Sequence, residues 1–519
     1  MVFTRIKIAA SDELRCPKDV NSSLLVLEIV PSEPGCAKGQ IIPSWSQIAH
    51  KVTQADEDMI SKLIDDVLLL IMEKVNLTTT MRASVLSTRW RHLPWLLTQH
   101  CIDINDFLHE PWADPTVDDH IDKAMESLIQ ALRSMLAPTR RKSIIKRLCI
   151  SFFITNGYSS EIGHLLNEAI ENGLVKDVEL TSGVERFPGH VSDEEMSRHA
   201  DLVNSFFGNY PNISCCLTRL SLYNATFVGS DLHHLLNTCT QLHDLFLYQC
   251  DTGYGSLFKI DAPNSKLNVL EFAHCSFDLV ELFCLPKLKE LICGFWSSRY
   301  LPLTLGYVPC LKEVEIYSAI TYQQPFKLSE FLCHAPCTES LILDFEGEKI
   351  WLQPEKNQLR SAFSNLRHLS LYGIFVGFGL LWTTALLEAA QALEILDIKV
   401  HEHLCEDKEE RKQIFTERTN GSWEVSERSH LQLKKLQLSG FNSTEQHIAF
   451  VGAIMGQAPN LHAVVLNEQH CKDCSAISEN PTRFPKNEDE REAVLNKLRS
   501  RFSSRAQIVF REHKHCSDY

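Results

Sequence analysis

A six-residue pattern, Leu-x-x-Leu-x-Leu, recurs along the chain and constrains the fold more than any other feature of its 519 residues. The clear copies begin at Leu217, Leu242, Leu267, Leu288, Leu311, Thr338, Leu366, Leu393, Leu433 and Leu461. Successive copies are separated by 25, 25, 21, 23, 27, 28, 27, 40 and 28 residues. One such hexamer means little, but ten copies at a nearly constant period indicate a repeated structural unit.

The repeat predicts a stack of short parallel strands. The fourth and sixth residues of each copy alternate with polar residues, as a half-buried strand requires. Each strand is too short to build a core alone, so stacked strands form one sheet and the connecting segments cover its other face. Several connections have helical apolar spacing, as in residues 230–241 and 384–392. The period is that of leucine-rich repeats.

We therefore expect an α/β protein built mainly as a leucine-rich-repeat solenoid of parallel strands with helical or irregular connections. The repeat array is assigned to residues 101–430, with weaker early copies at Ile145 and Val175, and the last repeats fall in residues 431–519. Residues 1–55 contain four prolines and are expected to be poorly ordered.

The cysteines fit the same architecture. Cys250 and Cys275 stand three residues after the sixth position, where such repeats favour Asn or Cys, and Cys293 occupies a core strand position. We expect all three to be small buried groups with a packing role rather than a redox role. The 18 cysteines are too sparse for a disulfide scaffold.

Aromatic side chains recur on the face of the strands that points away from the core. Tyrosine occupies the seventh position of four copies, and phenylalanine occupies one fifth position. Tyrosine offers a large contact area and a hydroxyl at low entropic cost, which suits a binding surface. The alternative is that these rings simply stack on one another along the ladder. The candidate substrate-binding residues are Tyr223, Phe246, Tyr248, Tyr317 and Tyr372.

A short helical segment, residues 56–100, precedes the repeats. Its pattern predicts three short helices, capped by Asp65, by Thr78 or Thr79, and by Ser87 or Thr88. The first helix is apolar nearly all round, since residues 67–72 are consecutive apolar residues, and such a helix is buried on several sides. A segment of this size builds only a small core, so we expect a partner, either the repeats or another protein.

This segment resembles an F-box. The residues that carry the resemblance are Ile60-Ser61-Lys62-Leu63, Asp65-Asp66-Val67-Leu68, Ile71, Ala83-Ser84-Val85-Leu86-Ser87 and Arg89-Trp90-Arg91-His92-Leu93. The family usually has Leu-Pro before Asp-Asp-Val-Leu, whereas this chain has Leu63-Ile64. Proline fixes φ, so its replacement predicts weaker binding of the partner. Residues 450–474 and 502–510 resemble the FBD-type tail of plant F-box/leucine-rich-repeat proteins.

The resemblance implies a substrate receptor of an SCF-type cullin–RING ubiquitin ligase. The F-box would bind a Skp-family adaptor, and the repeats would hold the protein to be ubiquitinated. The adaptor-binding residues that it implies are Leu63, Ile64, Val67, Leu68, Ile71, Val85, Leu86 and Trp90.

The charge and the hydropathy of the chain argue against several kinds of partner and location. The net charge of -15 argues against nucleic acid or an anionic membrane surface as a partner. No secretory signal is visible at the start of the sequence, and we expect a cytoplasmic or nuclear protein. The uncharged stretch at residues 369–387 approaches the length of a membrane span, but a buried strand followed by a buried helix explains it better.

Enzymatic signatures are absent from the sequence, which contains no phosphate-binding loop, zinc-protease motif or nucleophile elbow. We expect a non-catalytic protein without a cofactor or a metal. One alternative is a repeat scaffold with a degenerate F-box and no ligase role. Another is a thiol- or metal-dependent enzyme built around Cys471 and Cys474, with His470 beside them, although a zinc site needs a second ligand pair that the sequence does not show.

Overall fold

The structure is a computed structural model. It describes residues 63–75, 77–85, 87–108, 118–137, 141, 143–183, 191–228, 231–253, 257–294, 303–317, 326–345, 350–352, 355, 358–375, 379–401, 431–469, 484–501 and 504–512. The expectation for residues 1–55 lies outside these residues. The chain divides into two compact units, which we call unit 1 (up to Leu180) and unit 2 (from Thr181).

Unit 1 begins with three short helices, which we call the three-helix module (residues 63–97). They are α2 (Asp65–Met72), α3 (Leu77–Ser84) and the 3-10 helix η1 (Trp90–Leu96). The module has its own small core, made of Leu68, Met72, Trp90, Leu93 and Leu97. The prediction of three helices agrees with this arrangement, and the module supplies much of the cover for its apolar first helix from within.

The three helices begin at other positions than the expected caps predict. Asp65 is already inside α2, where Ile64 is the N-cap, and the Asp65 carboxylate instead pairs with Arg89 at 2.6 Å. Helix α3 begins at Leu77, ahead of both threonines. The N-cap of η1 is Arg89 rather than Ser87 or Thr88, although the Ser87 hydroxyl accepts a hydrogen bond from the Trp90 backbone N–H at 3.2 Å.

The rest of unit 1 alternates strands and helices. Its elements are β1 (Gln99–Asp103), η2 (Ile104–Asp106), α4 (Asp118–Leu136), β2 (Ile145–Phe152), α5 (Asn156–Glu171) and β3 (Val175–Ser182), in which the boundary between the units falls. The weak repeats at Ile145 and Val175 are therefore strands, as predicted. Strand β1, which carries no repeat motif, pairs in parallel with β2.

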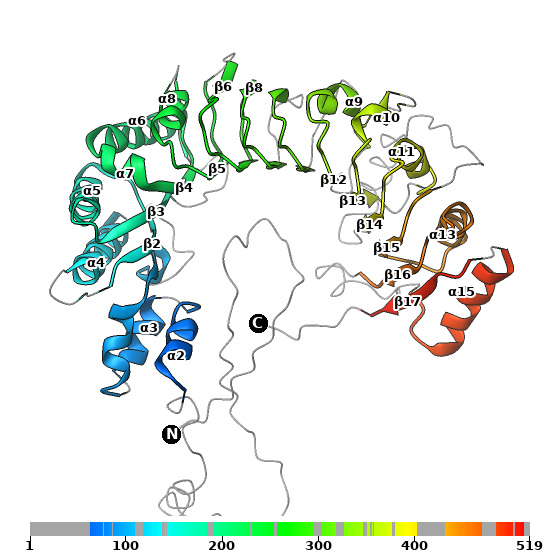
Figure 1. Ribbon diagram of the computed structural model, residues 1–519, viewed down its shortest axis with the longest axis horizontal. Coiled ribbons are helices and arrows are strands. Elements are labelled where there is room, and N and C mark those ends of the chain that lie inside the picture. The colour runs from blue at the N-terminus through cyan, green and yellow to red at the C-terminus, as the bar shows by residue number, and fades with distance from the viewer. Residues whose placement is uncertain are drawn as a thin grey trace, which may run out of the picture. The chain divides into compact units, whose positions relative to one another are not determined.

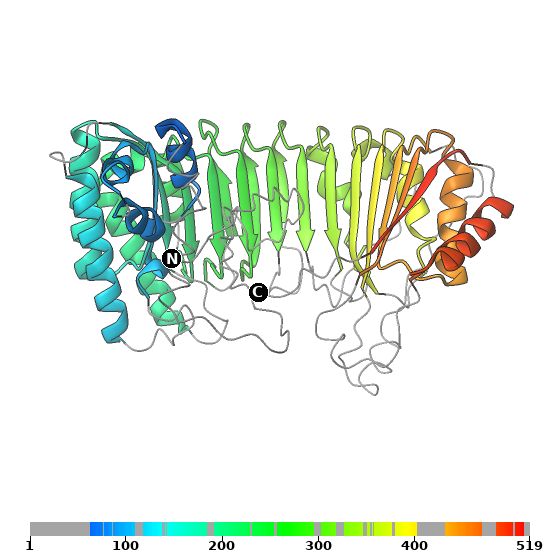
Figure 2. The same cartoon turned by 90° about the horizontal axis from the view of Figure 1, so that it is seen from below.

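Unit 2 contains the ten clear repeats, and each of them is a strand of one parallel sheet (Figure 1). In sheet order they are β4 (Leu217–Tyr223), β5 (Asp244–Tyr248), β7 (Val269–Ala273), β9 (Glu290–Gly294), β11 (Glu313–Tyr317), β12 (Ser340–Asp344), β13 (His368–Phe375), β14 (Ile395–His401), β15 (Lys435–Ser439) and β16 (Ala463–Asn467). Strand β17 (Gln507–Arg511) follows β16. Figure 2 shows these strands side by side and pointing the same way.

The helices of unit 2 lie on one face of this sheet (Figure 1). They are α6 (Asp193–Asn209), α7 (Pro211–Cys216), α8 (Asp231–Thr238), α9 (Leu328–Phe331), η3 (Leu332–His334), α10 (Leu359–Ala362), α11 (Thr383–Ala389), α13 (Glu445–Gln457) and α15 (Glu488–Arg501). The opposite face, which we call the open face, carries none of the helices in the described part of unit 2. Strand β13 and helix α11 account for the uncharged stretch at residues 369–387, as predicted.

The middle connections differ from the expected helices. Between β5 and β11 they form a second parallel sheet of β6 (Leu257–Asp261), β8 (Leu279–Cys284) and β10 (Leu303–Tyr307), in the order β10-β8-β6. The repeats here are short, at 21 to 25 residues, but length alone does not decide the connection, because the 25-residue repeat that begins at Leu217 contains helix α8. The connections alternate buried and exposed residues instead, as in β6.

The turns after β4, β5 and β7 explain the buried cysteines. Asn224, Gln249 and His274 follow the seventh position with φ of 52° to 54°, a left-handed conformation that reverses the chain direction. The next residue then points inward. Cys250 and Cys275 are fully buried there, and the Cys275 thiol donates to the Leu247 carbonyl of the preceding strand at 3.2 Å. The packing role predicted for these cysteines is confirmed.

Candidate functional site

The three-helix module exposes several apolar side chains. Val85, Ile64 and Leu70 are 78%, 65% and 61% exposed, although all three are large hydrophobic residues. Met81 on α3 is also exposed. Burying such side chains in a protein interface is worth roughly 1.5–3 kcal/mol each, so this surface favours a protein partner.

The structure separates the predicted adaptor-binding residues into three groups. Ile64 and Val85 are exposed; Leu63, Val67 and Ile71 are partly buried. Leu68 and Trp90 lie in the core of the module, with 0% and 9% exposure, and do not form part of its surface. Leu86 lies outside the described residues.

The sequence prediction missed Leu70 and Met81. Residues 67–72 are all apolar, so their pattern has no phase that distinguishes the exposed side of α2 from its buried side. Only the packing of α2 on η1 selects Leu68 and Met72 as the inward residues.

Ile64 stands where the resemblance to an F-box predicts a proline, and its backbone has the conformation that proline adopts. It has φ of −68° and ψ of 155°, and proline fixes φ near −65°. Its carbonyl accepts hydrogen bonds from the Val67 and Leu68 N–H groups, both at 3.1 Å. The chain therefore enters α2 with a φ that a proline at position 64 would also adopt.

The open face of the unit 2 sheet forms a second candidate surface, and the strand register arranges its side chains in rows. The fifth repeat positions place Phe246 beside Glu271, Glu271 beside Ile292, and Ile292 beside Glu315. The seventh positions place Tyr223 beside Tyr248. These two rings stack with centroids 4.6 Å apart and planes 15° apart.

Three of the tyrosines on the open face bind carboxylates through their hydroxyl groups. The Tyr248 hydroxyl donates to Glu271 Oε1 at 3.0 Å, and the Tyr372 hydroxyl donates to Asp397 Oδ2 at 3.0 Å. The Tyr317 hydroxyl donates to Glu315 on the same strand. These carboxylates hold the rings in fixed orientations.

A lysine and an arginine also lie against aromatic rings of the open face. The ammonium of Lys399 lies 3.9 Å from the centroid of the Tyr372 ring, and the guanidinium of Arg219 lies 5.3 Å from the centroid of the Phe246 ring. Phe246 is only 5% exposed, so this substrate-binding candidate packs within the face. The four tyrosines are half-buried and keep part of each ring accessible. The rings therefore interact with their neighbours, as the stacking alternative predicts, and the binding role of the tyrosines stays a prediction.

Burial changes the electrostatics of the open face. Glu271 is 2% exposed, and burial, reinforced by the nearby Glu315 and Glu290, raises its pKa to about 7 despite the opposing hydrogen bond from Tyr248. Burial also raises the pKa of Asp397 above its ordinary value. For Tyr317 and Tyr372, burial first and then the adjacent carboxylates raise the pKa of the hydroxyl, so both tyrosines stay neutral.

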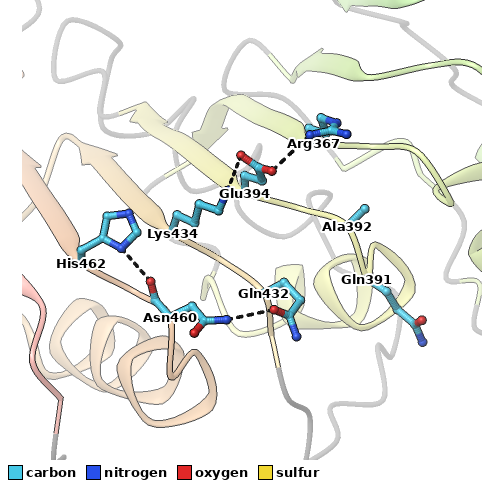
Figure 3. Close-up of a pocket in the computed structure, with 8 residues that line it drawn as sticks. All are labelled: Arg367, Gln391, Ala392, Glu394, Gln432, Lys434, Asn460 and His462. Carbon is cyan, nitrogen blue, oxygen red and sulfur yellow. Dashed lines mark hydrogen bonds and ion pairs between the residues drawn. The ribbon is translucent and has the colours of Figure 1, made fainter.

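A hollow of about 530 Å³ lies where the strands of the last repeats begin (Figure 3). Arg367, Glu394, Lys434 and His462, which line it, each occupy the second position of successive repeats. Glu394 accepts from Arg367 at 3.3 Å and from Lys434 at 2.9 Å, and these ion pairs lower its pKa, the Lys434 hydrogen bond being the larger cause. The charged groups that line the hollow largely pair with one another at an exposed edge of the sheet. Such a row of ion pairs between successive repeats is typical of a structural role rather than of a reaction site.

Two further expectations concern metals and membranes. No group of three or more His, Cys, Asp or Glu side chains that could hold a metal occurs in the described ranges. His470, Cys471 and Cys474 lie outside them. No helix among the residues that the structure describes is both long enough and apolar enough to cross a membrane.

Parallel strands repeated at this period, each with a buried fourth and sixth residue, define the class of leucine-rich-repeat proteins. A family model described as "At1g61320/AtMIF1, LRR domain" matches residues 147–498, and the chain belongs to this family. The solenoid that the repeats predict is thereby confirmed.

Comparison with individual proteins adds the plant F-box context. A protein of Arabidopsis thaliana named F-box/FBD/LRR-repeat protein At3g49040 is 26% identical over 273 residues, which cover 45% of this chain. The match spans 60% of that relative's own length. The recognition of a plant F-box/leucine-rich-repeat protein with an FBD-like tail is therefore confirmed, while the F-box assignment of the three helices stays a prediction. The chain also resembles the crystal structure of the mouse RP105/MD-1 complex, with 15% identity, a TM-score of 0.27, and coverage of 64% of this chain and 56% of that one.

Proposed function

We propose that the protein is the substrate-recognition subunit of an SCF-type E3 ubiquitin ligase. In this proposal the three-helix module binds a Skp-family adaptor, and the open face of unit 2 holds the protein to be ubiquitinated. The chain performs no chemistry itself, because its role is to raise the effective concentration of the substrate near a ubiquitin-loaded enzyme. The name of the Arabidopsis relative supports the F-box part of this proposal.

The observation that carries the proposal is the exposed apolar surface of the module. Ile64, at the start of α2, and Val85, after the end of α3, are both more than 60% exposed on a module whose core is already filled by other residues. Exposed apolar groups of this size on a small folded unit are typical of a protein-binding surface.

The test is co-purification of the full chain with a Skp-family adaptor, comparing wild type with Val85→Asp. A charge placed in a buried apolar interface costs several kcal/mol, so we expect binding at least about a hundredfold weaker. Val228→Asp is the matched control, since Val228 is a valine of unit 2 that is 65% exposed. Circular dichroism must show that both variants remain folded.

A second variant addresses the departure from the family pattern. Ile64 already has a proline-like φ, so Ile64→Pro should fold and should retain or increase adaptor binding. If wild type and Ile64→Pro both fail to bind any adaptor while remaining folded, the proposal is refuted. The chain is then a repeat scaffold without a ligase role.

The substrate side of the proposal places a protein on the open face through Tyr248, Tyr317 and Tyr372. A photo-crosslinking amino acid at Tyr372 should capture a protein whose ubiquitination depends on the adaptor. Tyr307 is the control site, because it is 61% exposed but lies on β10 of the second sheet. Equal crosslinking from both sites would show that the open face has no special role.

A further inference from the structure

Two cysteines of unit 1 face each other across neighbouring strands. Cys101 on β1 and Cys149 on β2 are register partners in the parallel pair. Neighbouring strands lie about 4.8 Å apart, which is within the range of Cα separations that a disulfide spans. The two Sγ atoms are 3.2 Å apart, at hydrogen-bond distance.

The two thiols differ in access and in acidity. Cys101 is exposed and Cys149 is half-buried. The hydrogen bond from Cys149 lowers the pKa of Cys101, and it outweighs burial and the carboxylates of Asp103, Glu179 and Asp106, which act in the opposite direction. The same hydrogen bond, together with burial, raises the pKa of Cys149. The more acidic thiol on the outside, with a less acidic thiol behind it, is the arrangement of an attacking and a resolving cysteine.

We propose that Cys101 and Cys149 form a peroxide-sensitive dithiol that closes reversibly to a disulfide. The Cys101 thiolate attacks hydrogen peroxide, the O–O bond breaks, and the sulfur becomes a sulfenic acid while the released hydroxide is protonated to water. The Cys149 sulfur then attacks the Cys101 sulfur, and the S–O bond breaks. The hydroxide that leaves takes the Cys149 proton, so two thiols and one peroxide give one disulfide and two waters.

The position of the pair gives the disulfide a structural effect. Strand β1 follows the three-helix module directly, and it is joined to β2 by backbone bonds such as those from Lys146 N and Arg147 N to the Thr98 carbonyl, at 2.8 and 3.2 Å. A covalent bond between Cys101 and Cys149 fixes this exit strand to β2. Oxidation is therefore expected to suppress local opening of β1 and to slow exchange of its amide hydrogens.

The test uses the full chain treated with hydrogen peroxide and mapped by mass spectrometry without reduction. We expect one linked peptide containing Cys101 and Cys149, with a loss of two hydrogens, and its disappearance on treatment with dithiothreitol. In untreated protein, Cys101 should be alkylated by iodoacetamide faster than Cys310, which is also exposed. Cys310→Ser is the matched control and should leave the linked peptide unchanged.

A variant identifies the attacking thiol. In Cys149→Ser the sulfenic acid on Cys101 has no resolving partner, and it should be trapped by dimedone after peroxide treatment. Recovery of the two cysteines without a linked peptide in oxidised wild type would overturn the proposal. The proposal would also be overturned if dimedone labelled Cys149 in the Cys101→Ser variant but did not label Cys101 in the Cys149→Ser variant. Mass-spectrometric mapping of oxidised wild type tests the proposal even if a variant fails to fold.

Discussion

The buried carboxylate of Glu271 allows a quantitative prediction. Its pKa lies at about 7 in the folded protein, against an ordinary value of 4.5. Each pKa unit corresponds to about 1.4 kcal/mol, so ionisation of Glu271 costs the folded state up to about 3 kcal/mol. Since the native state binds this proton more tightly than the unfolded chain, the stabilising contribution is complete below pH 4.5 and is lost as the pH rises to about 7.

Glu271→Gln removes the ionisation while keeping an oxygen that can accept from the Tyr248 hydroxyl. We expect the variant to be more stable than wild type above pH 7 by up to about 3 kcal/mol, and the difference to fall to about 1 kcal/mol or less at pH 5. For a unit of this size, about 1 kcal/mol changes the melting temperature by roughly 1.5 °C. The assay is thermal unfolding followed by circular dichroism between pH 5 and 8.5.

Glu313→Gln provides the control for this experiment. Glu313 lies on the same open face at a half-buried position, so a general effect of removing negative charge would appear in both variants. If the difference between Glu271→Gln and wild type is constant from pH 5 to 8.5, the reasoning from burial is wrong.

Three further predictions concern stability. Leu68→Ala should destabilise the three-helix module by about 2–5 kcal/mol because Leu68 is fully buried. Limited proteolysis should detect this loss of stability. Leu70→Ala is the control and should have little effect, because Leu70 is exposed. Gly440→Ala should cost about 1–3 kcal/mol in thermal unfolding, since φ is +76° and a Cβ would lie 2.7 Å from a backbone oxygen. Gly173→Ala should cost less, because its φ is +66° but nothing lies within 4 Å. Burial lowers the pKa of His100 to about 3. The stability that the neutral imidazole contributes is therefore lost as the pH falls below 6.5. Acidification to pH 4 should lower the melting temperature of wild type more than that of His100→Gln.

The strands of the fold could be predicted from the sequence because each repeat carries its own buried pattern. Leu220, Leu245 and Leu270, for example, mark the same inward position on three neighbouring strands. The connections could not be predicted equally well. A segment such as residues 257–261 has no helix cap or period, and it becomes β6 because it pairs with β8, a strand from the next repeat.

The candidate sites were predictable to different degrees. Tyr248 and Glu271 occupy the seventh and fifth positions of adjacent repeats, so aligning the repeats suffices to bring them together. The orientation of α2 was not predictable, since Leu68 and Leu70 belong to the same uninterrupted apolar run. Cys101 could not be paired with Cys149 either, because β1 carries no repeat motif that would set its register.

The second sheet of β6, β8 and β10 has a consequence for the curvature of the central repeats of unit 2. Where helices cover one face of a solenoid, their axes need to be about 8–10 Å apart, while the strands on the other face are about 4.8 Å apart. Successive repeats must then rotate relative to one another, and the solenoid curves. Strands on both faces have the same spacing, and neighbouring repeats can then stack without fanning. We therefore expect the stretch from β5 to β11 to be locally straight, so that a protein bound there would contact it best through a flat or extended segment.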